Sequence, residues 1–185
     1  MNASISHGDT MKHFIIAGTL LALSVPASSF AQDAKPAAAM NMSDLSAAQY
    51  VEMAASSDMF EIESSKVATE KAQSDDVKTF AGHMVSDHSA TTKDLMAAAK
   101  AEGIEMPKAM MPKHMAMVDD LKATDAASFD AAYIRAQTMA HEEAVALHTA
   151  YSKTGKDAAL KAVAAKAVPI VTEHLGDVKA IIAKI

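Results

Sequence analysis

The chain contains no cysteine and no tryptophan, and only six of its 185 residues are glycine. The absence of cysteine excludes disulfides, thiolate zinc sites, iron–sulfur clusters and cysteine nucleophiles. Any bound metal ion must therefore be held by His, Asp, Glu or Met. The scarcity of glycine argues against a phosphate-binding loop or a nucleophile elbow, and no His-Glu-x-x-His motif is present. The sequence thus gives little support to catalysis.

A surplus of positive charge is also missing, since the formal net charge is −6. Lysine and arginine form no cluster that could neutralise a run of phosphates, which argues against nucleic acid as a partner. What the chain does contain is mostly alanine, lysine, acidic residues, methionine and leucine, with few β-branched runs. This composition favours helices and gives strands almost no support.

The N-terminal segment has the pattern of a signal peptide. Met11-Lys12-His13 forms a short basic start, residues 14–25 form an apolar run, and Ser29-Phe30-Ala31 fits a cleavage site of small residues. We predict a signal peptide over residues 1–31, with Met11 as an alternative initiator, and export to the periplasm. The apolar run is shorter than the roughly 20 residues that span a bilayer, so the mature chain should have no integral membrane span. A retained anchor is the alternative.

The mature chain should then consist of a flexible lead-in over residues 32–45 and a single helical domain over residues 46–185. Apolar residues recur every three or four positions in four long segments, which begin near residues 46, 74, 128 and 157. A shorter segment of the same kind covers residues 113–122. We predict an all-α fold, namely an up-down four-helix bundle with an extra short helix between the second and third long helices.

Local signals indicate where these helices begin and end. Ser46 with Gln49 three residues later predicts a capping box, and Ser74 and Ser128 are candidate N-caps. Gly103 and Gly155 are candidate helix ends.

Four metal-capable residues fall on the apolar stripes of the four long helices, one on each: Glu61, His88, His141 and His174. A buried carboxylate or imidazole costs several kcal/mol unless it is paired, hydrogen-bonded or bound to a metal. In an up-down bundle with both short links at one end, a rise of ~1.5 Å per residue places the four at depths of about 18 to 27 Å. We therefore predict that they form one layer in the middle of the bundle.

Parts of the sequence resemble a known family. The segments that carry the resemblance are Phe60-Glu61-Ile62-Glu63, Met84 to His88, Phe129-Asp130-Ala131-Ala132-Tyr133 and His141-Glu142-Glu143-Ala144. They resemble the exported bacterial domain of unknown function numbered 4142, a family regarded as ferritin-like and often labelled an outer membrane protein. The resemblance covers residues 47–182. It implies a ferritin-like bundle in which Glu61, His88, His141 and His174 match shared polar positions, and it implies no established activity.

Two interpretations of the four-residue set remain open. One Glu and three His suit a single borderline divalent ion such as zinc, iron, copper or nickel. A two-iron carboxylate site is disfavoured, because Val85 and Val171 stand where Glu-x-x-His motifs would need Glu. The alternative is a metal-free polar network that includes Tyr133 and Gln137. Asp87 and Glu173 are interpreted as solvated groups or as hydrogen-bonding supports rather than as ligands.

A second cluster of possible ligands lies between the second and third long helices: Met106, Met110, Met111, His114, Met115 and Met117. Thioethers and imidazole suit copper, especially Cu(I), and Met40 and Met42 could contribute to such a site. The alternative is packing, because Met fills irregular gaps in apolar cores. Asp130 and Tyr133 could act as acid and base, but their spacing near a helix start favours a cap or an inter-helix hydrogen bond.

We therefore interpret the chain as an exported helical-bundle protein that binds a divalent metal ion in its core, with a role in metal homeostasis or envelope stress. The first alternative is a structural or interaction protein of the cell envelope whose polar core binds nothing. The second is copper handling through the Met-rich cluster.

Overall fold

The computed structural model describes residues 42–184, and within this range every regular element is a helix. A short 3-10 helix, η1 (Met42–Asp44), precedes five α-helices: α1 (Ala47–Lys71), α2 (Asp75–Ala101), α3 (Pro112–Ala123), α4 (Ala126–Thr154) and α5 (Ala158–Ile182). None of the helices in this range is long and apolar enough to cross a membrane. The predicted signal peptide and the first ten residues of the predicted lead-in lie outside the described residues.

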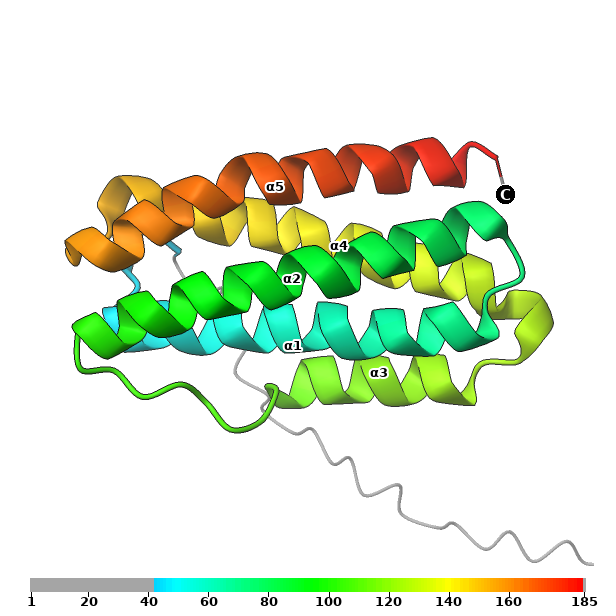
Figure 1. Ribbon diagram of the computed structural model, residues 1–185, viewed down its shortest axis with the longest axis horizontal. Coiled ribbons are helices and arrows are strands. Elements are labelled where there is room, and N and C mark those ends of the chain that lie inside the picture. Colours follow the sequence, from blue (N-terminus) through cyan, green and yellow to red (C-terminus); the bar gives the residue numbers. More distant parts are fainter. Residues whose placement is uncertain (1–41, 185) are drawn as a thin grey trace, which may run out of the picture. The chain divides into compact units, whose positions relative to one another are not determined.

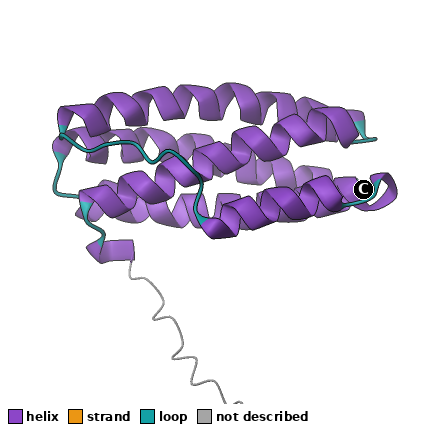
Figure 2. Ribbon diagram, turned by 90° about the horizontal axis from the view of Figure 1, so that it is seen from below, coloured by secondary structure: helices purple, strands orange, loops and turns teal. Residues whose placement is uncertain are grey.

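The four long helices lie side by side (Figures 1 and 2). Helix α1 packs against α2 and α4, and α5 packs against the same two helices, so the four surround a common interior. The short helix α3 lies outside this group, against α1 and α4. The all-helical prediction is confirmed for the described part of the chain, and α3 lies in the connection between α2 and α4.

Most helix ends follow the local signals in the sequence. The capping box at Ser46 and Gln49 is present, and Ser74 is the N-cap of α2, although its side chain makes no capping hydrogen bond. Gly103 takes the left-handed conformation, with φ +68°, and ends α2 as expected. The predicted cap of α4 was wrong. The N-cap is Asp125, whose carboxylate accepts the backbone N–H of Ser128, because the helix begins three residues earlier than its apolar stripe.

The two short links lie at opposite ends of the helices, and the expectation that they share one end was wrong. The Asp130 carboxylate, at the start of α4, accepts the backbone N–H groups of Gln73 and Ser74 in the α1–α2 link at 3.1 and 2.8 Å. Lys71, at the end of α1, donates to the carbonyl of Thr124 just before α4 at 2.6 Å. The connection that contains α3 has therefore returned along α1, so that α2 and α4 start at the same end and run in the same direction (Figure 1).

A polar layer separates two apolar clusters in the interior. One cluster includes Tyr50 and Leu95 near the α4–α5 link, and the other includes Phe80 and Phe129 near the α1–α2 link. Every long helix contributes to both clusters. Between these contributions each helix carries one of the four expected residues, namely Glu61, His88, His141 and His174, all of them buried. The four residues still form one layer although α4 runs opposite to the predicted direction, because each residue lies near the middle of its helix.

Candidate metal centre

Three of the four expected residues meet in the buried layer. His88 from α2, His141 from α4 and His174 from α5 each place one possible ligand atom within 4.8 Å of the other two. Nε2 of His141 lies 3.4 Å from Nδ1 of His174, and the centre of the His88 ring lies 5.7 and 5.4 Å from the centres of these two rings. Three helices thus bring three imidazoles to one point.

The nitrogen of each ring that faces away from this point contacts an oxygen atom that can only accept. Nδ1 of His88 lies 2.8 Å from the Asp58 carboxylate, and Nδ1 of His141 lies 2.9 Å from the backbone carbonyl of Gln137. Nε2 of His174 lies 3.2 Å from the Asp87 carboxylate. Because a carbonyl or carboxylate oxygen cannot donate, each outer nitrogen must carry the hydrogen. A neutral ring then presents a lone pair on its inner nitrogen.

The supporting carboxylate of Asp58 is itself held firmly. It accepts hydrogen bonds from the hydroxyls of Thr91 and Thr92, both at 3.0 Å, and these residues lie one turn beyond His88 on α2. Asp58 is 6% exposed. Its role was not predicted from the sequence. The available signal was its place three residues before Glu61, on the face of α1 that also carries Ala54 and Ala55, where a carboxylate needs a partner.

Glu61 lies beside His141 and does not join the group of three converging nitrogens. Its Oε1 is 3.6 Å from Nδ1 of His141, on the side of the ring that faces away from His174. Neither carboxylate oxygen has a hydrogen-bond partner within the described chain. Burial raises the pKa of Glu61 to about 7, so this group holds its proton far more readily than an exposed glutamate.

Of the three rings, His88 is the one that binds a proton most readily, because of the charges around it. Burial lowers the pKa of His88, but the carboxylates of Asp58 and Glu61 outweigh this effect and raise it above the usual value. Burial, and then the charge of His88, lower the pKa of His141 to about 3. The same two causes lower the pKa of His174. His141 and His174 therefore stay neutral at physiological pH and keep their inner lone pairs available.

The three histidines and their supporting residues lie in a segment of the chain that matches a family model. The model describes a domain of unknown function (DUF4142) and matches residues 31–181. The chain belongs to this family. Searches of curated proteins and of solved structures found no match to the chain.

The Met-rich cluster of this DUF4142 chain mostly packs against α1. His114 places Nδ1 2.7 Å from the hydroxyl of Ser56, which also accepts the backbone N–H of Met111 at 2.7 Å. The His114 ring stacks on Phe60 at 5.4 Å between centres. Met110 and Met117 pack against the small cluster of Phe60, Val118 and Ala140, while Met115 is 41% exposed. Ser56 thus fastens the long connection to α1, a role that the sequence did not reveal.

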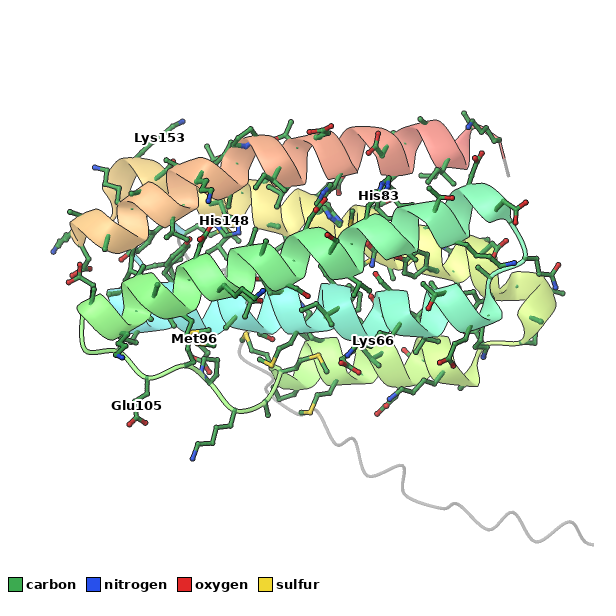
Figure 3. All side chains as sticks on the ribbon, in the orientation of Figure 1. Lys66, His83, Met96, Glu105, His148 and Lys153 are labelled. Atoms are coloured by element: carbon green, nitrogen blue, oxygen red, sulfur yellow. The ribbon has the colours of Figure 1, made fainter. Side chains whose placement is uncertain are left out.

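Other singled-out residues of the DUF4142 chain have structural partners. The hydroxyl of Tyr133 lies 2.8 Å from that of Ser65, and Asp130 ties the α1–α2 link to α4, so both make the expected inter-helix hydrogen bonds. His148 lies near the end of α4, with Nδ1 3.0 Å from the hydroxyl of Tyr50 (Figure 3). Of the two acids beside stripe histidines, Asp87 supports His174, whereas Glu173 is exposed.

Proposed function

We propose that this protein binds one divalent transition-metal ion through Nε2 of His88, Nε2 of His141 and Nδ1 of His174. The observation that carries the proposal is the direction of the ring hydrogens. Three acceptor-only oxygens orient the N–H groups outward, so three neutral rings would bring three lone pairs together in the buried interior. Nε2 of His88 has no hydrogen-bond partner within the described residues. A cation satisfies all three lone pairs at once, and supporting oxygens of this kind are the usual outer partners of metal-binding histidines.

The donor set narrows the choice of ion. Three imidazole nitrogens suit zinc, iron, copper or nickel, and they are a poor match for magnesium or calcium, which prefer oxygen. The nearby carboxylates of Asp58 and Asp87 already accept hydrogen bonds from the rings. With three protein ligands the ion keeps at least one open position for water or another small ligand. We assign binding and no reaction.

The setting of this function is the cell envelope. We infer export from the signal-peptide pattern of residues 1–31, and a ferritin-like four-helix bundle from the single long crossover between α2 and α4. A periplasmic metal-binding bundle fits metal homeostasis or an envelope stress response. Mass spectrometry of periplasmic material should find a chain that begins near Gln32, and a chain that retains residues 11–31 would favour a membrane anchor.

Metal-dependent stability tests the binding itself. A ligand that binds the folded state stabilises it by ~2.7 kcal/mol at 100 times its dissociation constant. Chelation should therefore lower the melting temperature of protein purified without a His tag, and one of zinc, ferrous iron, copper or nickel should restore it. A protein that responds neither to chelator nor to any of these ions has a metal-free polar core, and the role of an envelope interaction protein then takes the place of metal binding.

A further inference from the structure

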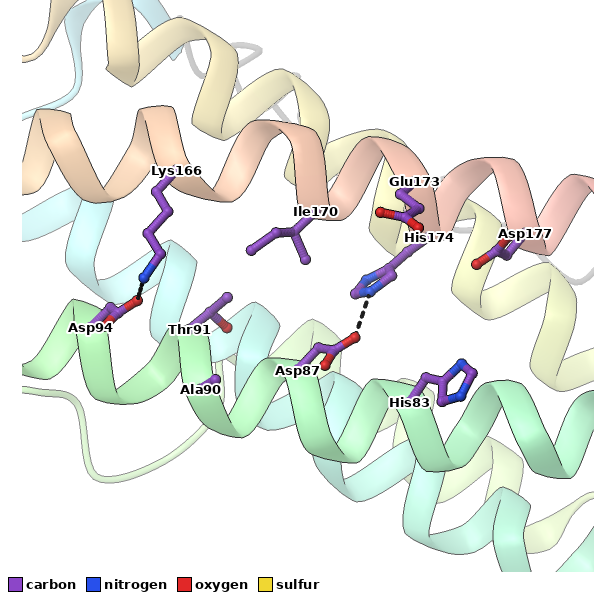
Figure 4. A pocket seen from close by; sticks show the side chains of 10 residues that line it. All are labelled: His83, Asp87, Ala90, Thr91, Asp94, Lys166, Ile170, Glu173, His174 and Asp177. Carbon is purple, nitrogen blue, oxygen red and sulfur yellow. Dashed lines mark hydrogen bonds and ion pairs between the residues drawn. The ribbon is translucent and has the colours of Figure 1, made fainter.

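A groove on the surface between α2 and α5 reaches the buried centre at His174. It has a volume of about 300 Å³, and its walls include Ala90 and Thr91 from α2 and Ile170 from α5 (Figure 4). The rings of His88 and His141 are at most 2% exposed and do not line this groove. His174 is therefore the member of the group that connects the groove to the interior.

The position of His174 gives each side of its ring a different neighbour. Nδ1 faces the interior, 3.4 Å from Nε2 of His141. Nε2 faces the groove, 3.2 Å from the carboxylate of Asp87, whose side chain is 47% exposed. Figure 4 shows this contact spanning the groove from α5 to α2. An ion that passes Asp87 would thus meet His174 before either of the other two rings.

The groove carries an excess of negative charge. Four carboxylates line it, those of Asp87, Asp94, Glu173 and Asp177, against a single lysine, Lys166. Lys166 pairs with Asp94 across the groove. The remaining three carboxylates form no ion pair with lysine or arginine in residues 42–184. A cleft lined by one sign of charge concentrates ions of the opposite sign and speeds their association.

We infer that divalent cations enter and leave the buried centre through this groove, drawn in by its carboxylates and passing His174 before they reach the other two rings. The inference rests on the proposed function, since it describes the route to that same site. A buried site requires a path for the ion, because the three rings lie beneath the surface. The route also explains the acidic lining, since no other contact of Glu173 or Asp177 in the described chain accounts for it.

A steric plug tests the route. Ala90 is exposed on the α2 wall of the groove, so Ala90→Trp should narrow the path without touching a ligand. Because an obstacle on the path raises the barrier in both directions, the association and dissociation rate constants of Co²⁺ should fall by the same factor while its dissociation constant stays the same. Stopped-flow absorption of the Co²⁺ d–d bands measures both rates. Ala97→Trp, on an exposed position of α2 outside the groove, is the matched control and should leave both rates unchanged.

The charges of the groove provide a second test with an expected sign in each direction. The double variant Glu173→Gln/Asp177→Asn should slow Co²⁺ association about tenfold at low ionic strength, and the difference should shrink in high salt. Lys166→Gln should accelerate association. The double variant Glu52→Gln/Glu70→Gln removes the same charge from exposed positions of α1 and should have little effect.

Two outcomes separate this route from the proposed function. A wild type that binds neither Co²⁺ nor zinc, iron, copper or nickel refutes the metal site, and the route with it. A wild type that binds Co²⁺, but whose rates are the same in the plugged and the charge-depleted variants, refutes the groove as the entrance and leaves the site intact.

Discussion

The protein buries two kinds of histidine, and they differ in the partner that holds the ring. His114 and His148 each contact a hydroxyl, that of Ser56 and that of Tyr50. A hydroxyl can donate or accept, so either tautomer of these rings can be satisfied. His88, His141 and His174 instead contact carboxylate or carbonyl oxygens, which require a hydrogen on the outer nitrogen. Burial alone therefore does not mark a metal site, whereas the direction of the lone pairs does.

The largest expected effect on metal affinity comes from replacing a histidine of the second kind. Helix α4 carries one histidine of each kind, so the two replacements can be compared on the same helix. His141→Ala should reduce metal affinity by more than the roughly 10–100-fold typical of losing a supporting partner, because it removes a ligand. His148→Ala lies two turns away on α4 and should leave the affinity unchanged. Both variants should lose stability of about 1–3 kcal/mol, since each leaves buried polar groups unpaired. Competition with a chromophoric chelator, together with denaturant unfolding of the metal-free protein, separates the two effects. Equal losses of affinity would remove the distinction between the two kinds.

The next effect concerns the supporting partners. Asp58→Ala should lower metal affinity about 10–100-fold, because His88 loses the carboxylate that orients its ring. Ser56→Ala removes the hydroxyl partner of His114 from the same helix and should leave the affinity unchanged. Isothermal titration with Zn²⁺ under matched conditions compares the variants. An Asp58 variant with wild-type affinity would show that the carboxylate merely fills the interior.

The difference between the two kinds of histidine also shows what could be predicted from the sequence. The apolar stripes placed Glu61, His88, His141 and His174 near the middle of their helices, and this anticipated the buried layer even though the predicted direction of α4 was wrong. The supporting oxygens were harder to predict. Asp58 contacts His88 because α1 packs against α2, and the backbone carbonyl of Gln137 contacts His141 because of the rotation of that ring. Periodicity along a helix does not report either of these.

The direction of α4 was beyond sequence reasoning for a similar reason. Residues 102–125 are long enough to join α2 to either end of the next helix. The return along α1 depends on contacts between distant residues, such as Lys71 with the carbonyl of Thr124 and Ser56 with the backbone of Met111. The capping box of Ser46 and the glycine at residue 103 were predictable because both act within a few residues of the chain.

The pH dependence of metal binding should follow His88. Its pKa in the folded, metal-free protein lies above 6.5, so a proton competes with the ion there, whereas the lowered pKa values of His141 and His174 leave those rings unprotonated. Affinity should be constant above the raised pKa and fall about tenfold per pH unit below it. Zn²⁺ titrations between pH 5.5 and 8.5 measure this slope. Release of two protons for each ion bound would mean that a second group, either another ring or Glu61, holds a proton in the metal-free state.

His88 and His148 should affect the stability of the metal-free protein in opposite ways, because their pKa values are shifted in opposite directions. Burial lowers the pKa of His148 to about 4, so below pH 6.5 the unfolded chain binds a proton that the folded protein does not, and stability falls as the pH drops toward 4. The raised pKa of His88 contributes stability that is present below pH 6.5 and is lost as the pH rises through its folded pKa. In EDTA, His148→Gln should therefore reduce the acid loss measured by denaturant unfolding. An unchanged loss would assign the acid sensitivity to other groups.

The smallest expected effect concerns Glu61, which was predicted from the sequence to be a ligand together with the three histidines. Its carboxylate lies next to Nδ1 of His141, the nitrogen that faces away from the converging lone pairs. Glu61→Gln should therefore change metal affinity by less than the roughly tenfold lower bound for a supporting partner. A loss as large as that of His141→Ala would make Glu61 a fourth ligand.

The same variant should alter stability with a definite sign. Burial raises the pKa of Glu61 from 4.5 to about 7, so its ionisation carries a cost that is absent below pH 4.5 and complete above about pH 7. A neutral glutamine avoids this cost, and the metal-free variant should gain stability relative to the wild type as the pH rises through that interval. Denaturant unfolding at pH 5 and pH 8 tests this. A variant that is less stable at both values would show that the carboxyl group itself is needed in the core.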